Sequence, residues 1–235
     1  MAQRIPFRNR AHEVSRLEAF SDVIFGFSIS LLVVSLEAPK DYSELMVMMR
    51  GFIPFAIAFL LLIDVWLEHH DFFRRYALDD RPTITLNTIL LFVVLFYVYP
   101  LKFVFVSAVN SILGQHSGVE RNEMPTLFVI YGLGFAAVFF LLGFMYRHAY
   151  SRRRELQLNA VEEIDTLESV YDNFATGAFG LVSAVLALLL PAKAAGLAGF
   201  LYFLIFIPKM TIPWRMARKR RAIEEQMLSA PESPG

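Results

Sequence analysis

The sequence contains no cysteine and has little charge. None of its 235 residues is Cys, which excludes a disulfide framework, a thiolate nucleophile and a cysteine zinc site. Charged residues make up 19% of the chain and cancel to a formal net charge of zero, whereas soluble domains carry roughly 25%. Nucleic-acid binders normally present a basic surface. We therefore expect no nucleic-acid partner, and we also expect no cofactor, no bound metal and no catalytic residue.

Hydrophobic residues are abundant and gather in long runs. They make up 56% of the chain, which includes 23 Phe. A helix needs ~20 mostly apolar residues to cross the hydrocarbon core of a bilayer. We predict an all-α membrane protein with six transmembrane helices, at about residues 17–36, 47–67, 84–106, 125–146, 174–192 and 194–213. Residues 1–222 then form a single six-helix transmembrane domain, and residues 223–235 form a flexible C-terminal tail.

The basic residues predict the orientation of these helices. Sixteen of the 22 Lys and Arg residues lie before the first span, between the second and third, after the fourth, or after the sixth. All of these segments lie on one side of a six-span chain. Basic residues near transmembrane helices accumulate on the cytoplasmic side, so we predict that both termini are cytoplasmic.

One connecting segment is longer than the others. Between Arg147 and Asp172, apolar residues recur at helical spacing among acidic ones, a pattern typical of an amphipathic helix. We expect this helix to lie against its own bundle or on the membrane surface; a regulatory docking site is the alternative.

Three polar residues are predicted to lie at similar depth near the cytoplasmic side. Asp22 lies near the start of the first span, His69 follows the end of the second, and Asn87 lies near the start of the third. Polar and ionisable groups are costly inside a membrane and therefore need partners. We interpret the three residues as a buried hydrogen-bond cluster that links the helices. Proton sensing or gating, and metal binding, use the same residue types and remain alternatives.

These polar residues also belong to a recognisable signature. Its members are Arg16, Phe20, Ser21 and Asp22 in the first span, Trp66 and His69 around the end of the second, and Asn87 followed by Pro100 in the third. The pattern resembles the signature of the transmembrane protein 175 family of potassium channels, and the similarity extends over all six spans. The bacterial members resemble this chain in carrying one six-helix repeat, which implies a multi-pass protein of the bacterial inner membrane.

The resemblance implies a homotetramer that conducts potassium ions and has no enzymatic activity. The first helices of the four subunits would line a central pore without a carbonyl filter. The chain indeed contains no loop similar to Thr-Val-Gly-Tyr-Gly, so any selectivity would depend on side chains.

One face of the first span is the candidate pore lining. Three- and four-residue spacing places six residues on it: Phe20, Val23, Phe27, Ser30, Leu31 and Val34. Such a stripe by itself favours helix packing, whereas the resemblance implies that it lines the pore. We expect the constriction and the selectivity to depend on Phe27, Ser30, Leu31 and Val34. The alternative function is a secondary transporter or a proton-coupled membrane protein.

Overall fold

The protein is an assembly of long helices. The computed structural model describes residues 6–34, 40–42, 45–46, 49, 52–112, 118–120, 122–190, 211–212, 216–218 and 220–223, and these contain no β-strand. The long helices are α1 (Arg16–Val34), α3 (Phe52–Tyr76), α4 (Arg81–Ile112), α5 (Met124–Ser151) and α6 (Ala160–Leu189). The predicted all-helical class is therefore confirmed.

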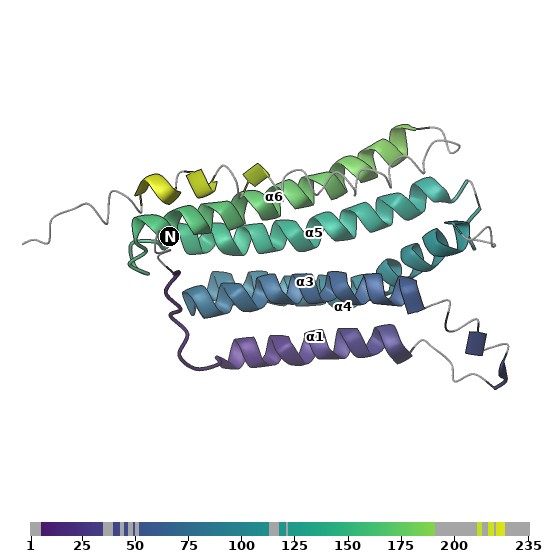
Figure 1. Ribbon diagram of the computed structural model, residues 1–235, viewed down its shortest axis with the longest axis horizontal. Helices are drawn as coiled ribbons and strands as arrows, with labels where there is room; N and C mark the ends of the chain where they lie inside the picture. The colour runs from purple at the N-terminus through teal and green to yellow at the C-terminus, as the bar shows by residue number, and fades with distance from the viewer. Residues whose placement is uncertain are drawn as a thin grey trace, which may run out of the picture.

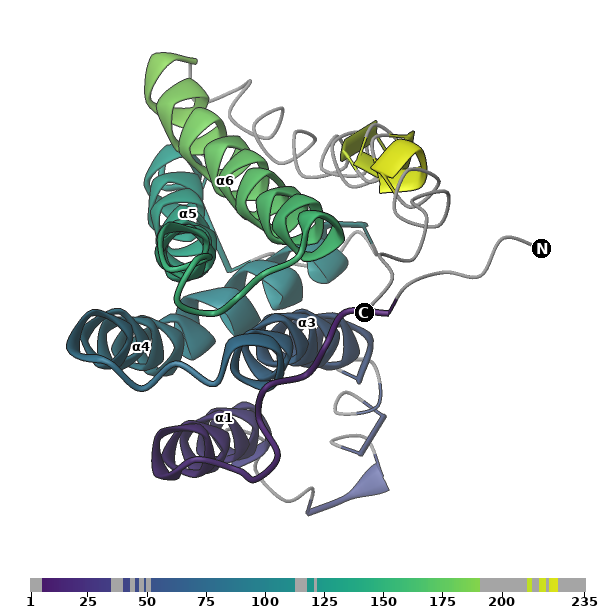
Figure 2. The same ribbon diagram turned by 90° about the vertical axis from the view of Figure 1, so that its left-hand side faces the viewer.

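The helices lie side by side in three layers (Figure 1). Helix α1 lies along one edge, α3 and α4 form the middle layer, and α5 and α6 lie on the opposite edge. The end-on view shows α1 packed beside α3 and α4 and far from α5 and α6 (Figure 2). The position of α1 therefore depends on its contacts with the middle layer and on the chain segments at its two ends.

Three of the helices are long and apolar enough to cross a membrane, within Arg81–Ser107, Met124–Ser151 and Ala160–Leu189. Helices α1 and α3 overlap the first two predicted spans, but α3 continues to Tyr76, well beyond residue 67. Most of the predicted sixth span, 194–213, and all but the first residue of the predicted tail, 223–235, lie outside the described residues.

The segment between Arg147 and Asp172 differs from the single amphipathic helix that we predicted. Helix α5 ends at Ser151, and Gln157 in the connection has a positive φ of 49°, which interrupts a helix. A capping box of Asn159 and Glu162 then starts α6, which continues without a break into the apolar stretch. The amphipathic residues after Asn159 therefore form the first turns of α6. Val161 and Val170 are buried, so the apolar side of these turns packs against the bundle.

Asp80 organises the corner between α3 and α4. Its Oδ1 accepts hydrogen bonds from the backbone N–H and hydroxyl of Thr83, at 3.1 and 2.6 Å. Its Oδ2 lies 2.7 Å from His148 Nε2 and 3.2 Å from an Arg152 nitrogen. One carboxylate thus starts α4 and ties it to the end of α5.

We expect acid to weaken this corner. Burial by itself raises the pKa of Asp80, but the hydrogen bonds from Thr83 and His148 outweigh it and hold the pKa below its usual value. A carboxyl with a depressed folded-state pKa contributes stability above its unfolded-state pKa of ~3.9 and loses it as the pH falls through the folded-state value. As the pH is lowered below about 4, the melting temperature of the unmodified protein should therefore fall more steeply than that of Asp80→Asn. Parallel curves for the two proteins would contradict this role.

Candidate functional site

Helix α1 begins with a side-chain cap. Ser15 Oγ accepts a hydrogen bond from the backbone N–H of Glu18 at 3.1 Å, as expected of a residue that precedes a helix. The Glu18 carboxylate is buried and lies 3.5 Å from His70 Nδ1 on α3. The first turn of α1 is thus attached to α3.

The two faces of α1 have different surroundings. Ser21, Phe25, Ser28 and Leu32 are buried, and their spacing places them on the face toward α3 and α4. On the other face Phe20, Val23 and Phe27 are 57%, 70% and 54% exposed, and Ser30 is exposed as well. Four of the six residues of the predicted stripe therefore lie on a face that nothing within the described residues of one chain covers.

The other two residues of the stripe are placed differently. Leu31 is half-buried and packs against the hydrophobic core. Val34 is the last residue of α1, and its side chain lies outside what the structure describes.

A buried hydrogen-bond chain joins three helices. Ser21 Oγ on α1 donates to the Leu17 carbonyl at 2.8 Å and accepts a bond from Asn87 Nδ2 on α4 at 2.9 Å. Asn87 Oδ1 then lies 2.8 Å from His69 Nε2 on α3. Because the amide group of Asn87 donates to Ser21, its oxygen accepts from His69, which assigns the ring proton to Nε2. His69 Nδ1 is buried and has no hydrogen-bond partner within the described residues.

Asp22 belongs to a second, separate contact. Trp66 Nε1 on α3 donates to Asp22 Oδ1 at 2.8 Å, and the Trp66 ring stacks on His70 at a centroid distance of 5.4 Å. Our hypothesis grouped Asp22 with His69 and Asn87. The structure brings His69 and Asn87 into direct contact, but their partner on α1 is the preceding residue, Ser21. Arg16, the first residue of the signature, is exposed at the start of α1.

One contact to α1 has no counterpart in the sequence interpretation. Lys102 Nζ on α4 donates to the Leu32 carbonyl at 3.2 Å, two residues before α1 ends. The last carbonyls of a helix lack partners within the helix and carry partial negative charge, which a nearby cation stabilises. A lysine inside an apolar span was the signal that such a partner was needed.

The chemistry of the site is hydrogen bonding. Within the described ranges, no three His, Asp or Glu side chains are grouped in a way that could hold a metal ion. The polar groups instead connect α1, α3 and α4, and no residue that the structure describes covers the opposite face of α1.

Comparisons with known proteins agree with the signature. The family model described as endosomal/lysosomal potassium channel TMEM175 matches residues 16–97. A protein of Marivirga tractuosa named "Potassium channel" is 38% identical over 227 residues, covering 91% of this chain and 92% of the relative. A second potassium channel, from Chamaesiphon minutus, is 25% identical over 168 residues, covering 68% of this chain and 77% of the relative.

Solved structures show the same relationship. The potassium channel MtTMEM175, solved as a variant with a nanobody fusion protein, superposes with a TM-score of 0.80 at 38% identity, covering 93% of this chain and all of that one. A TMEM175 homologue from Chamaesiphon minutus shares the fold, with a TM-score of 0.57 at 20% identity over 86% of this chain and 99% of that one. With the long match at 38% identity, these findings show that the chain belongs to the TMEM175 family of potassium channels.

Proposed function

We propose that four copies of this chain form a potassium-selective channel whose pore is lined by the four α1 helices. The observation that carries the proposal is the uncovered face of α1, with Phe20, Val23, Phe27 and Ser30 on a helix whose opposite face is fixed to α3 and α4. One chain supplies only one wall of a pore, so several copies are needed to enclose it. The relatives at 38% and 25% identity are both named potassium channels.

Phe27 forms the constriction in this proposal. Four phenyl rings around an axis make an apolar ring, and water leaves a narrow apolar passage readily, so ions meet a dehydration barrier there. The barrier depends on side chains alone, which fits a chain without a carbonyl filter sequence.

Ser30, one turn further along α1, supplies the oxygen atoms. Its hydroxyl donates to the Gly26 carbonyl of its own helix at 2.9 Å. With the proton engaged in that bond, the lone pairs of Oγ remain as acceptors on the uncovered face. Four such oxygens partly replace the hydration that an ion loses at the Phe27 ring.

The chain in this proposal is a multi-pass protein of the bacterial inner membrane with both termini in the cytoplasm. Two ion pairs support placing both termini on the same side of the membrane. Arg8 contacts Glu162 at 3.0 Å and Arg220 contacts Asp165 at 3.3 Å, and both carboxylates lie in the first turns of α6. The residues near both ends of the chain therefore lie at the same end of the bundle.

Current recordings from purified protein in planar bilayers test the proposal. We expect unitary currents whose reversal potential follows the potassium gradient rather than the sodium gradient. Coupled potassium flux without unitary currents would instead favour a secondary transporter. Protein that reconstitutes fully but passes no ions would overturn the proposal.

Ser30→Ala should affect selectivity more than conductance. The substitution removes the acceptor oxygen and scarcely changes the width of the pore, so the ratio of potassium to sodium permeability should fall while unitary conductance stays close to that of the unmodified protein. Bi-ionic reversal potentials measure the first quantity, and single-channel amplitudes measure the second. Ser28→Ala is the matched control, because Ser28 makes the same bond to its own helix but is buried on the opposite face. An unchanged permeability ratio in Ser30→Ala would exclude a role of this oxygen in selectivity.

A further inference from the structure

The segment before α1 is bound across the end of the bundle where α3 ends and α6 begins. We call residues 6–15 the N-terminal strap. The backbone N–H groups of Arg10 and Ala11 both donate to the Arg74 carbonyl near the end of α3, at 3.1 and 3.3 Å. The Phe7 ring packs edge-on against Tyr76, with ring centroids 5.7 Å apart. The strap is thus attached to α3 by its backbone and by an aromatic contact.

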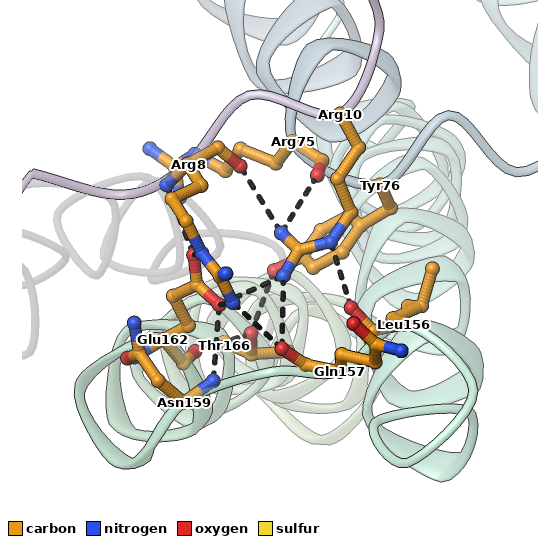
Figure 3. A network of polar contacts seen from close by, with 9 residues as sticks. All are labelled: Arg8, Arg10, Arg75, Tyr76, Leu156, Gln157, Asn159, Glu162 and Thr166. Atoms are coloured by element: carbon orange, nitrogen blue, oxygen red, sulfur yellow. Dashed lines mark hydrogen bonds and ion pairs between the residues drawn. The ribbon is translucent and has the colours of Figure 1, made fainter. Parts of the chain in front are cut away.

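A buried carboxylate on α6 holds the other side of the strap. Glu162 accepts hydrogen bonds from Arg8, through the backbone N–H, Nε and a terminal nitrogen, each at 3.0 Å. Arg10 donates a fourth bond at 2.8 Å, and the backbone N–H of Asn159 donates a fifth at 3.0 Å. Figure 3 shows both arginine side chains converging on this one carboxylate. The Glu162 side chain is only 1% exposed, so its charge is compensated almost entirely by the strap and by the start of α6.

Arg10 is the central residue of the strap. Its guanidinium group also donates to the carbonyls of Leu156 at 2.9 Å, Arg8 at 3.0 Å and Arg75 at 3.3 Å (Figure 3). A planar guanidinium with five fixed donors suits a site where several acceptors converge. The Arg10 side chain is 17% exposed and that of Arg8 is 58% exposed. Solvent therefore screens the contact of Arg8 more than that of Arg10.

The strap connects α6 to α1 over a short stretch of chain. Four residues separate Ala11, bonded to α3, from Arg16 at the start of α1. The last of them is Ser15, which caps α1. Although α1 lies on the edge of the bundle opposite α6 (Figure 2), the strap links the start of α6 to the start of α1.

We propose that Glu162 is a positioning residue for the pore helix: by holding Arg8 and Arg10 of the N-terminal strap, it sets the position of the cytoplasmic end of α1 and thereby the open state of the pore. The second half of this statement rests on the proposed channel function. The first half concerns the distance between helices within one chain and does not depend on it.

Glu162→Gln removes the charge and keeps the size of the side chain. The matched control is Glu163→Gln, which makes the same change one residue later, where Glu163 is 37% exposed and 3.9 Å from Arg153 rather than bonded to the strap. Arg10→Gln and Arg8→Gln remove the partners, and we expect Arg10→Gln to have the larger effect because Arg10 is the more buried of the two. Glu162→Asp keeps the charge and should restore part of the effect.

The absence of cysteine allows a direct measurement of the position of α1. Spin labels at Ala19→Cys on α1 and Arg154→Cys after α5, both exposed positions, report the distance between the two elements in an otherwise cysteine-free chain. Labelled chains diluted with an excess of unlabelled chains give the distance within one subunit. Unlabelled variants are recorded in bilayers to obtain the open probability.

We expect Glu162→Gln to broaden or shift the distance distribution and to change the ratio of open to closed channels by roughly fivefold or more, the lower end of usual couplings between sites. Glu163→Gln should change neither. If Glu162→Gln fails to assemble, Arg10→Gln is read in the same way, since it breaks the same contact and leaves the carboxylate of Glu162 with its bonds from Arg8 and Asn159.

Three results would overturn the proposal. An unchanged distance distribution in an assembled Glu162→Gln protein would show that the strap does not position α1. A broadened distribution with unchanged gating would show that the strap holds α1 without acting on the pore. If Glu162→Asp regained neither the distance distribution nor the open probability of the unmodified protein, the charge of residue 162 would not be what positions α1. If the unmodified protein passes no ions, the channel function fails separately, and the distances still decide the role of Glu162 in positioning α1.

Discussion

Truncation of Phe27 to alanine is expected to raise unitary conductance and to weaken the discrimination between potassium and sodium. The phenyl ring is 54% exposed on the uncovered face of α1. Its removal widens and wets the apolar ring that four copies would form, which lowers the dehydration barrier for every cation. Sodium permeation gains more than potassium permeation, because a wide, wet passage lets both ions keep their water and thus removes the difference in their dehydration cost.

Stability measurements separate this effect from a packing role. Removing a phenylalanine that is packed in a core leaves a cavity and costs ~3–5 kcal/mol. Phe27 is more than half exposed in one chain, so we expect a much smaller loss of melting temperature. Phe92→Ala is the control, because Phe92 is 70% exposed on α4 rather than on α1, and its truncation should leave permeation unchanged. A large loss of stability in Phe27→Ala with normal permeation would show that Phe27 packs between helices and does not line the pore.

Helical periodicity indicates which residues of α1 share a face. Residues three and four positions apart share a face, so Phe20, Val23 and Phe27 had to point the same way, and all three are exposed. The partners of the polar residues were harder to predict. Ser21 and Asp22 are adjacent and differ by about 100° around the helix axis. The rotation of α1 against α3 and α4 determines which of the two meets Asn87, and this rotation depends on packing that no local pattern reveals.

Helical periodicity could not predict the contacts of the N-terminal strap. Arg8 and Glu162 are 154 residues apart in sequence, and the strap itself has no regular structure from which a face could be deduced. The sequence analysis used the arginines before the first span only as evidence of the cytoplasmic side. Two of them also serve as partners for a buried carboxylate. The one available signal was Glu162 itself, an acidic residue among the apolar residues of an amphipathic helix, since a carboxylate buried there needs a partner.

Replacing Asn87 with leucine is expected to prevent assembly of a stable protein. Asn87 is fully buried and hydrogen-bonds to both Ser21 and His69. Leucine has a similar size, so little cavity forms, but His69 then keeps no hydrogen-bond partner at Nε2 and already has none at Nδ1 within the described residues. Each buried polar group left without a partner costs ~1–3 kcal/mol, a large share of a typical unfolding free energy of ~5–15 kcal/mol.

Detergent melting curves and size-exclusion profiles measure the loss. Thr88→Val is the control, because the adjacent Thr88 is exposed and its hydroxyl donates to the Ile84 carbonyl of its own helix.

The double variant Asn87→Leu with His69→Phe supplies the decisive comparison. Replacing both partners of a buried hydrogen bond by apolar groups of similar shape can be nearly neutral, so the double variant should recover much of the stability that the single variant loses. Recovery of assembly with normal pH dependence of the currents would identify the Ser21–Asn87–His69 chain as a device for joining helices. A stable Asn87→Leu protein with altered pH dependence would instead assign His69 to proton sensing.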